Sequence, residues 1–318
     1  MIVYIIKRLF GIVGILAVMS MLVFAITQIM PGNVASILAG QFADEATIAA
    51  IEQRLGLDAP IYIQYWNWAS NFVVGDFGES LIMERPVSEL IWTAFSNSAI
   101  IAMLAFVCVA VLGIFFGVWA AIRVNKTADH TISLVSYIGI SVPEFVWAIL
   151  SVIVFARYLN WLPSSGQGSL SEGIVDWASH LVLPVATLTL TLIAHVSRLT
   201  RSSMIESMQS NYVRNARAKG LPERVVIYRH ALRNALLPTI TVLAIDVGWL
   251  LGNIVVIETV FSYPGIGRLL LFAIERHDLP LIQAGILLIA AVYCIANLIA
   301  DLLYAYFNPR IRYGHSAV

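Results

Sequence analysis

The strongest constraint on this chain is a set of six long apolar segments. Each holds roughly 20 mostly apolar residues, the length that an α-helix needs to cross a bilayer. The runs are too long for strands and do not alternate, and lipid offers no partners for backbone polar groups, so the segments are predicted to be helices. The sequence thus predicts an all-α integral membrane protein with six transmembrane helices. These lie at about residues 9–30, 99–122, 133–156, 181–196, 236–257 and 281–300.

Composition excludes other protein classes. Of the 318 residues, 59% are hydrophobic and 12% are charged, whereas a soluble domain has about 45–50% and about 25%. This excludes a soluble enzyme, a disordered chain and a nucleic-acid-binding module. Both cysteines, Cys108 and Cys294, lie inside apolar stretches, so we interpret them as buried, inert thiols that cannot build a metal cluster.

The first apolar segment resembles a signal peptide at its start, because Lys7 and Arg8 precede it. Its apolar run of about 22 residues is too long for a typical signal peptide, and it ends at Pro31 and Gly32 without a clear cleavage site. We therefore interpret it as a retained helix.

Charge predicts the orientation. When loops are assigned alternately to the two sides, one side receives 14 Lys and Arg residues and the other receives 5. The positive-inside rule then places both termini in the cytoplasm. The predicted division is a helix at 1–30, an extracytoplasmic subdomain at 31–97 with eight acidic residues, a five-helix core at 98–307 and a cytoplasmic tail at 308–318.

The outer subdomain has local signals of its own. Residues 44–55 predict an amphipathic helix with Ile48, Ile51 and Leu55 on one face, ended by Gly56. Four aromatic residues follow, and they suggest anchoring at the membrane interface. Packing of this segment on the helices and contact with another protein remain equally open. The aromatic residues are Tyr62, Tyr65, Trp66 and Trp68.

The most specific feature is a basic loop at about residues 198–235. Residues before Lys219 favour helix, Gly220 can supply a positive φ stop, and Pro222 suits the start of a second short helix. Pro238 is expected to mark a break before the fifth span. A rigid cationic corner suits docking into a soluble partner, although positive-inside statistics alone would also place cations here. The six cations are Arg214, Arg217, Lys219, Arg224, Arg229 and Arg233.

This loop resembles the EAA loop of binding-protein-dependent ABC transporter permeases. Its form in the oligopeptide, dipeptide and nickel subfamily is similar to Ala216-Arg-Ala-Lys-Gly-Leu-Pro followed by Arg229-His-Ala-Leu-Arg-Asn-Ala-Leu-Leu-Pro238. Arg214 and Asn215 depart from the Glu and Ala of the general motif, and the spacing from Gly220 to Pro238 is longer than in that motif. Further similar pieces occur in order: Leu55-Gly-Leu-Asp-Ala-Pro60, Gly75-Asp-Phe-Gly-Glu-Ser80, Ser141-Val-Pro-Glu-Phe145, Leu162-Pro-Ser-Ser-Gly166, Glu258-Thr-Val-Phe-Ser-Tyr-Pro-Gly-Ile-Gly267 and Asn308-Pro-Arg310.

The resemblance implies a type I ABC importer permease fold with an extracytoplasmic insertion between the first two helices. It implies a heterodimer with a second homologous permease, two cytoplasmic ABC ATPase subunits that hold ATP and Mg, and an extracytoplasmic solute-binding protein. Di- or oligopeptides are the leading solute, with nickel chelates, glutathione or opine-like solutes as alternatives. The residues expected to couple to the ATPase are Arg214, Asn215, Ala216, Arg217, Ala218, Lys219, Gly220, Leu221, Pro222, Glu223 and Arg224.

Sequence motifs for chemistry on this chain are missing. No G-x-x-x-x-G-K-[ST], H-E-x-x-H or G-x-S-x-G pattern occurs. We therefore expect no catalytic residue, no metal and no cofactor here, with ATPase activity on partner subunits. His180, His195, Asp246 and Asp301 are too scattered in sequence to indicate a membrane protease. An ion-coupled secondary transporter stays as a distant alternative.

Polar groups inside spans are costly and are candidates for function. Those for the translocation pathway are Glu144, Asp246, Asn253 and Glu258. Satisfied interhelix hydrogen bonds are the alternative for each of them. We also expect Pro143 to kink its span, and the pairs Gly113/Gly117 and Gly248/Gly252 to allow close helix approach. A short re-entrant element is expected to cover the outer mouth, with gate candidates Phe261, Tyr263, Pro264 and Gly265.

Overall fold

The computed structural model describes residues 2–29, 44–55 and 58–307. Within these ranges the chain is helical, and the single β contact is a bridge between Glu79 and Pro86. Five helices are long and apolar enough to cross a membrane, or six if one bent pair counts as a span. The predicted helical membrane fold is thereby confirmed. The chain divides into two compact units, Met1–Asn97 with Gly265–Cys294, and Ser98–Pro264 with Ile295–Val318.

The first unit contains α1 (Ile2–Ile29), α3 (Glu45–Leu55), α4 (Ile61–Val73), α12 (Ile266–Arg276) and the beginnings of α5 (Val87–Ile122) and α13 (Leu279–Phe307). Polar contacts join its elements. The amide of Gln283 on α13 donates to Thr27 Oγ1 on α1 at 2.8 Å. The hydroxyl of Ser80 donates to the buried carboxylate of Asp278, which precedes α13.

The predicted outer helix is confirmed as α3. Asp44 caps it, because one carboxylate oxygen accepts the backbone N–H of Thr47 at 3.0 Å. Hydrogen bonds from Thr47 lower the pKa of Asp44. The side chains of Ile51 and Leu55 and the predicted stop at Gly56 lie outside the described residues, as does the tail at 308–318.

The four aromatic residues of α4 divide into two pairs. Tyr65 and Trp68 pack on the ring of Phe24 in α1, with centroid distances of 5.4 and 5.6 Å. Tyr62 and Trp66 are 72% and 73% exposed. Packing on a helix is therefore confirmed for the first pair, while the exposed pair stays free for the membrane interface or another protein.

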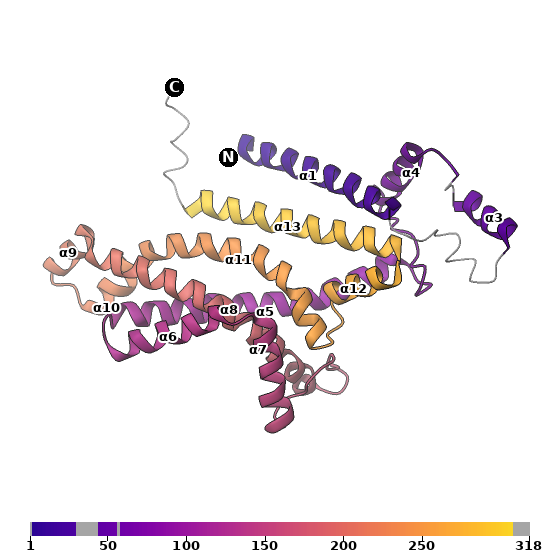
Figure 1. Ribbon diagram of the computed structural model, residues 1–318. Helices are drawn as coiled ribbons and strands as arrows, with labels where there is room; N and C mark the ends of the chain where they lie inside the picture. The colour runs from indigo at the N-terminus through magenta and orange to yellow at the C-terminus, as the bar shows by residue number, and fades with distance from the viewer. Residues whose placement is uncertain (1, 30–43, 56–57, 308–318) are drawn as a thin grey trace. The chain divides into compact units, whose positions relative to one another are not determined.

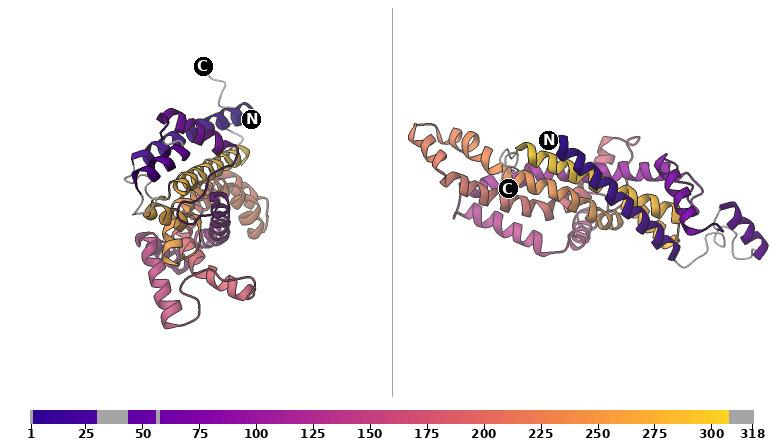
Figure 2. Two further views of the ribbon diagram at one scale, coloured as in Figure 1. Left: turned by 90° about the vertical axis from the view of Figure 1, so that its right-hand side faces the viewer. Right: turned by 90° about the horizontal axis from the view of Figure 1, so that it is seen from above.

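The second unit contains the rest of α5, then α6 (Thr127–Ser141), α7 (Glu144–Ser151), the π-helical η1 (Val152–Tyr158), α8 (Ile174–Gln209), α9 (Asn211–Ala218), α10 (Glu223–Val225), the π-helical η2 (Val226–Ala231) and α11 (Leu232–Val260). Figure 1 and the views of Figure 2 show α6, α8 and α11 running alongside one another. Buried Leu188, Leu192 and Val196 of α8 form a core with Leu250 and Ile254 of α11.

Glycines on α5 allow it to approach α8 closely. A Cβ at Gly117 would lie 2.5 Å from Thr200 Cβ, and one at Gly113 would lie 2.8 Å from Val196 Cγ1. The expected close approach is confirmed for this pair, within the chain. A Cβ at Gly252 of α11 would meet no atom within 4 Å, so that position is open.

The third predicted span differs from expectation. It is not one helix, because α6 and α7 meet at an angle of 102°. Pro143 has no N–H to donate to the carbonyl of Gly139 four residues earlier. The indole N–H of Trp147 donates to that carbonyl instead, at 3.2 Å. The kink expected at Pro143 is present, and a side chain beyond it satisfies the freed backbone oxygen.

Three expectations about the basic loop were wrong. Pro238 lies inside α11 and does not break it. The second short helix of the corner is not separate either, because α10 runs through η2 into α11 as one candidate span, Glu223–Val260. A π-turn accommodates an extra residue without ending a helix. The chain is therefore continuously helical from Glu223, directly after Pro222, to Val260. Moreover, α8 extends to Gln209, so Arg198 and Arg201 lie on a helix and not in a loop.

Candidate functional site

The basic elbow, residues 214–224, is a rigid corner between α9 and α10. Helix α9 ends at Ala218, Gly220 adopts φ +75°, and Pro222 precedes α10. The guanidinium of Arg217 spans the corner with two hydrogen bonds to Glu223, at 2.7 and 3.1 Å. This interaction raises the pKa of Arg217. The predicted Gly-Leu-Pro corner is confirmed, and the ion pair that closes it is new.

A buried apolar cluster attaches the elbow to the long helices. Val213 and Ala216 of α9 are buried against Met204 of α8 and against Val226 and Ala231 of η2. A displacement of the elbow therefore moves the end of α8 and the start of α11 with it, because packed side chains do not deform continuously.

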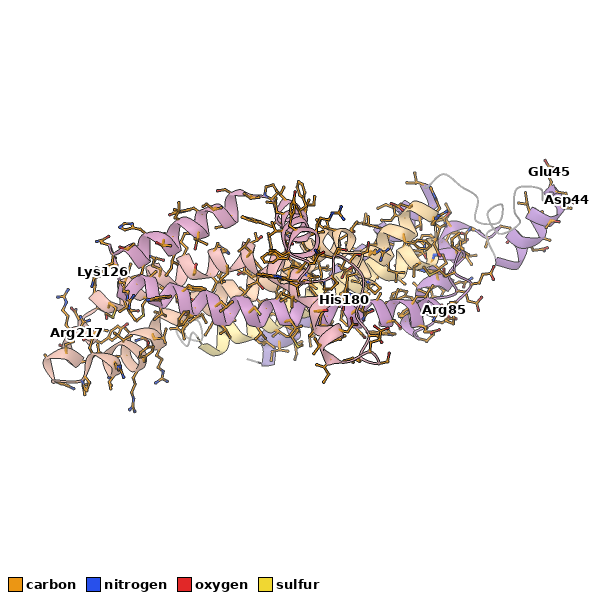
Figure 3. All side chains as sticks on the ribbon, turned by 90° about the horizontal axis from the view of Figure 1, so that it is seen from below. Asp44, Glu45, Arg85, Lys126, His180 and Arg217 are labelled. Carbon is orange, nitrogen blue, oxygen red and sulfur yellow. The ribbon has the colours of Figure 1, made fainter. Side chains whose placement is uncertain are left out.

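The charges of the elbow face outward. All six predicted cations are exposed, and Leu221 at the corner is 36% exposed. Within the second unit, Figure 3 shows Arg217 at the same end as Lys126 and far from His180. Lys126 and Arg217, two of the cations that were assigned to one side from sequence, thus lie at the same end of this unit.

A histidine–aspartate pair joins α8 to α11. His195 Nδ1 lies 3.3 Å from one carboxylate oxygen of Asp246, and the other oxygen is buried without a hydrogen-bond partner in the described part of the chain. His195 is 47% exposed, while Asp246 is 5% exposed. The sequence separation of 51 residues concealed this pair. Asn253, two turns further along α11, is half-buried, and its amide donates to the carbonyl of Trp249.

Glu144 begins α7 immediately after the bend. Both of its carboxylate oxygens are buried and have no hydrogen-bond partner among the residues that the structure describes. Because buried polar groups are usually hydrogen-bonded, we expect the carboxyl group of Glu144 to gain a polar partner from a ligand or from a rearrangement of the surrounding residues.

The gate candidates of the second unit form a buried turn after α11. Phe261 and Tyr263 are 2% and 0% exposed. The carbonyl of Phe261 accepts the N–H of Gly166 at 2.8 Å, which brings together two of the sequence motifs. Pro264 is exposed, and Gly265, which precedes α12, belongs to the first unit.

Glu258 lies just before this turn and is fully buried. Its carboxylate accepts the hydroxyl of Ser98 on α5, and its backbone carbonyl accepts the N–H of Tyr263 at 2.8 Å. Ser98 carried no signal in the sequence, since a serine in an apolar helix usually bonds its own backbone. Glu258 thus links α5, α11 and the turn.

Among the described residues, no three His, Cys, Asp or Glu side chains are arranged to hold a metal ion. The geometry is that of a helical membrane scaffold with a stiff basic corner at one end and isolated polar groups between its helices.

Comparisons with known proteins agree with this description. Residues 113–313 match the family of the binding-protein-dependent transport system inner membrane component, and residues 1–88 match its N-terminal family. A probable peptide ABC transporter permease protein of Sinorhizobium fredii is 38% identical over 98% of this chain and 99% of its own length. The glutathione transport system permease protein GsiC of Escherichia coli (strain K12) is 40% identical over the same shares.

The fold also has a solved counterpart. The crystal structure of an amino acid ABC transporter with histidines covers 70% of this chain and 94% of its own chain, with a TM-score of 0.51 and 15% sequence identity. The apolar helices, the basic elbow and the near full-length relatives lead to one conclusion. The chain belongs to the inner membrane components of binding-protein-dependent transport systems, the permeases of ABC transporters.

Proposed function

We propose that this chain is one of two permease subunits of an ATP-driven importer for short peptides, with peptides of glutathione size included. The relatives named for peptide and glutathione transport support this solute class. The observation that carries the mechanism is the basic elbow, which is closed by the Arg217–Glu223 pair and packed onto α8 and η2.

The elbow is the contact for a cytoplasmic ATPase subunit. Its exposed cations and Leu221 enter a groove of that partner, and residues 214–224 provide the docking surface. Two such ATPases hold ATP and Mg, and their closure displaces the elbow. Because the elbow continues into α11 through η2, the displacement biases the permease between two arrangements, and the chain acts by stabilising them differently.

The pathway lies between this chain and a second homologous permease, and an extracytoplasmic binding protein delivers the solute. A peptide carries an ammonium and a carboxylate, so partly satisfied carboxylates are suitable transient contacts. Glu144, Asp246 with its exposed partner His195, and Asn253 serve this role. Glu258 acts indirectly, because it holds the turn that carries Phe261 and Tyr263, the outer gate.

The docking role is tested by Gly220→Val and Arg217→Glu in the complete transporter, reconstituted in liposomes. Val at φ +75° is strained, so the first change distorts the corner, and the second places an acid beside Glu223. We expect labelled peptide uptake to fall at least about tenfold, while membrane insertion stays normal and ATP hydrolysis no longer follows solute addition. A tenfold change corresponds to about 1.4 kcal/mol of lost coupling energy.

Arg157→Gln provides the matched control, because Arg157 is an exposed arginine at the end of η1, outside the elbow. Normal uptake by both elbow variants would contradict the docking role. Liposomes that contain this chain alone and accumulate peptide on an ion gradient would contradict ATP-driven transport altogether.

The solute class is tested separately. Unlabelled tripeptides and glutathione should compete with labelled peptide uptake by the complete transporter, whereas a nickel chelate should not. Competition by the chelate alone would refute the peptide assignment and leave the coupling mechanism intact.

A further inference from the structure

A recess opens in the second unit between α5, α6 and α8. Its cavity volume is about 40 Å³, which is room for a small polar group and is well below the range for sites that hold a whole small molecule. Its lining combines hydroxyls, arginines and apolar side chains. The residues are Ala120, Ile132, Ser133, Ser136, Tyr137, Ile140, Ser197, Arg198 and Arg201.

The two arginines of the recess have different partners. Arg201 donates Nε and one Nη to the buried carboxylate of Asp129, at 2.5 and 2.7 Å. This pair fixes Arg201 in the wall and leaves other guanidinium N–H groups available. Arg198, one turn earlier and exposed, has no acidic partner among the described residues. The recess therefore carries one uncompensated positive charge.

Hydroxyl groups complete a polar wall. Ser136 and Ser197 lie 3.2 Å apart across the α6–α8 contact, and Ser133 lies one turn before Ser136. Arginine with serine hydroxyls is a donor set suited to phosphate oxygens, because a phosphate accepts several charge-assisted hydrogen bonds at once.

The recess is placed at the level of a membrane interface. It lies where the apolar run of α8 ends, since Arg198 and Arg201 directly follow that run, and α5 contributes Ala120 from its last turn. Nearby, the guanidinium of Arg123 lies 5.4 Å from the ring centre of the partly exposed Trp119, an arrangement typical of interfacial anchors. Beside the recess, α6 exposes Leu134, Val135 and Ile138, which offer an apolar surface to a hydrocarbon chain.

From these features we propose that the recess binds the phosphate headgroup of an anionic phospholipid from the leaflet at the basic end of the spans. Arg198 is the cationic anchor, the hydroxyl of Ser133 donates to the phosphate, and an acyl chain lies along the exposed face of α6. Ser197 donates to the carbonyl of Ala194 and Ser136 donates to Ser197, so these two hydroxyls form the wall beside the phosphate. Basic pockets between transmembrane helices commonly select such lipids. The site is separate from the elbow and from the pathway residues.

The experiment uses the complete transporter, delipidated in mild detergent and titrated with phosphatidylglycerol or phosphatidylcholine, with bound lipid counted by native mass spectrometry. We expect phosphatidylglycerol to bind more tightly than phosphatidylcholine. Arg198→Gln should weaken phosphatidylglycerol binding about five- to tenfold, the value of one interfacial arginine with its hydrogen bonds. Ser133→Leu, which fills the recess without changing charge, should weaken it similarly.

Arg157→Gln removes an exposed arginine outside the recess and should change binding less than about twofold. Equal effects of the Arg198 and Arg157 variants, or unaltered binding by the Ser133 variant, would overturn the proposal. Inorganic phosphate and glycerophosphoglycerol separate the two sources of this chemistry. Displacement of the lipid by either one at millimolar concentration would show a soluble anion site and would also overturn it.

Discussion

Replacing Gly117 by alanine tests the closest helix contact in the second unit. The added Cβ would lie 2.5 Å from Thr200 Cβ and 2.6 Å from the backbone oxygen of Ser197. Neither atom is the far end of a flexible side chain, so relief requires α5 and α8 to separate. Overpacking of this kind costs about 1–3 kcal/mol, whereas alanine is favoured over glycine within a helix by about 0.5–1 kcal/mol. We expect a net loss of about 1–2 kcal/mol.

Gly14→Ala is the matched control, since a Cβ at Gly14 of α1 would meet no atom of the described residues within 4 Å. This substitution retains only the helix-propensity gain, so it should be neutral or slightly stabilising. A loss of stability for Gly117→Ala but not for Gly14→Ala would therefore report the α5–α8 contact and not a general effect of alanine in a helix.

The assay is thermal unfolding of the purified transporter in mild detergent, followed by loss of the monodisperse peak on size exclusion. At about 2–4 °C per kcal/mol, Gly117→Ala should lower the apparent Tm by several degrees and Gly14→Ala should not lower it. An unchanged or higher Tm for Gly117→Ala would refute the tight α5–α8 packing.

Three further changes test separate contacts. Asp129→Asn leaves Arg201, which is 29% exposed, without its anionic partner, and should cost about 1–2 kcal/mol; the same unfolding assay should show a smaller loss for Glu89→Gln, whose pair with Arg85 is exposed. Trp147→Phe leaves the carbonyl of Gly139 without its donor and should cost about 0.5–1.5 kcal/mol, unlike Trp161→Phe, where the ring is 69% exposed. Acid should loosen the start of α3, because the pKa of Asp44 is lowered in the folded chain, so its cap is intact at neutral pH and is lost as the pH falls through that lowered pKa. A spin label at Gln53 should report increased mobility in acid for the native chain, and an Asp44→Asn variant that responds identically would contradict this assignment.

The sequence alone determined the membrane class, most of the helices and the elbow. A long apolar segment predicts a transmembrane helix, because its backbone N–H and C=O groups must form hydrogen bonds within the segment when it lies in lipid. This argument requires no information about other elements of the fold. The corner at Gly220 and Pro222 and the cap at Asp44 also follow from local chemistry, since each depends on the φ angle or hydrogen bond of a few adjacent residues.

Whether a helix continues through a proline was harder to predict, because it depends on which other residues pack against the helix and replace the missing hydrogen bond. Pro143 gives a bend of 102° in which Trp147 supplies the missing donor. Pro238 has the same local chemistry and stays within α11. The presence of a proline therefore does not by itself predict whether the helix bends or continues.

Only the tertiary structure decided which polar groups meet. His195 pairs with Asp246 across 51 residues, Ser98 with Glu258 across 160, and Ser80 with Asp278 across 198. Helices α5 and α11, which hold Ser98 and Glu258, are apolar on nearly every side, so hydropathy does not fix their rotation about their axes. Close packing at positions such as Gly113 and Gly117 fixes it instead, and it thereby determines which buried polar groups are satisfied and which remain available.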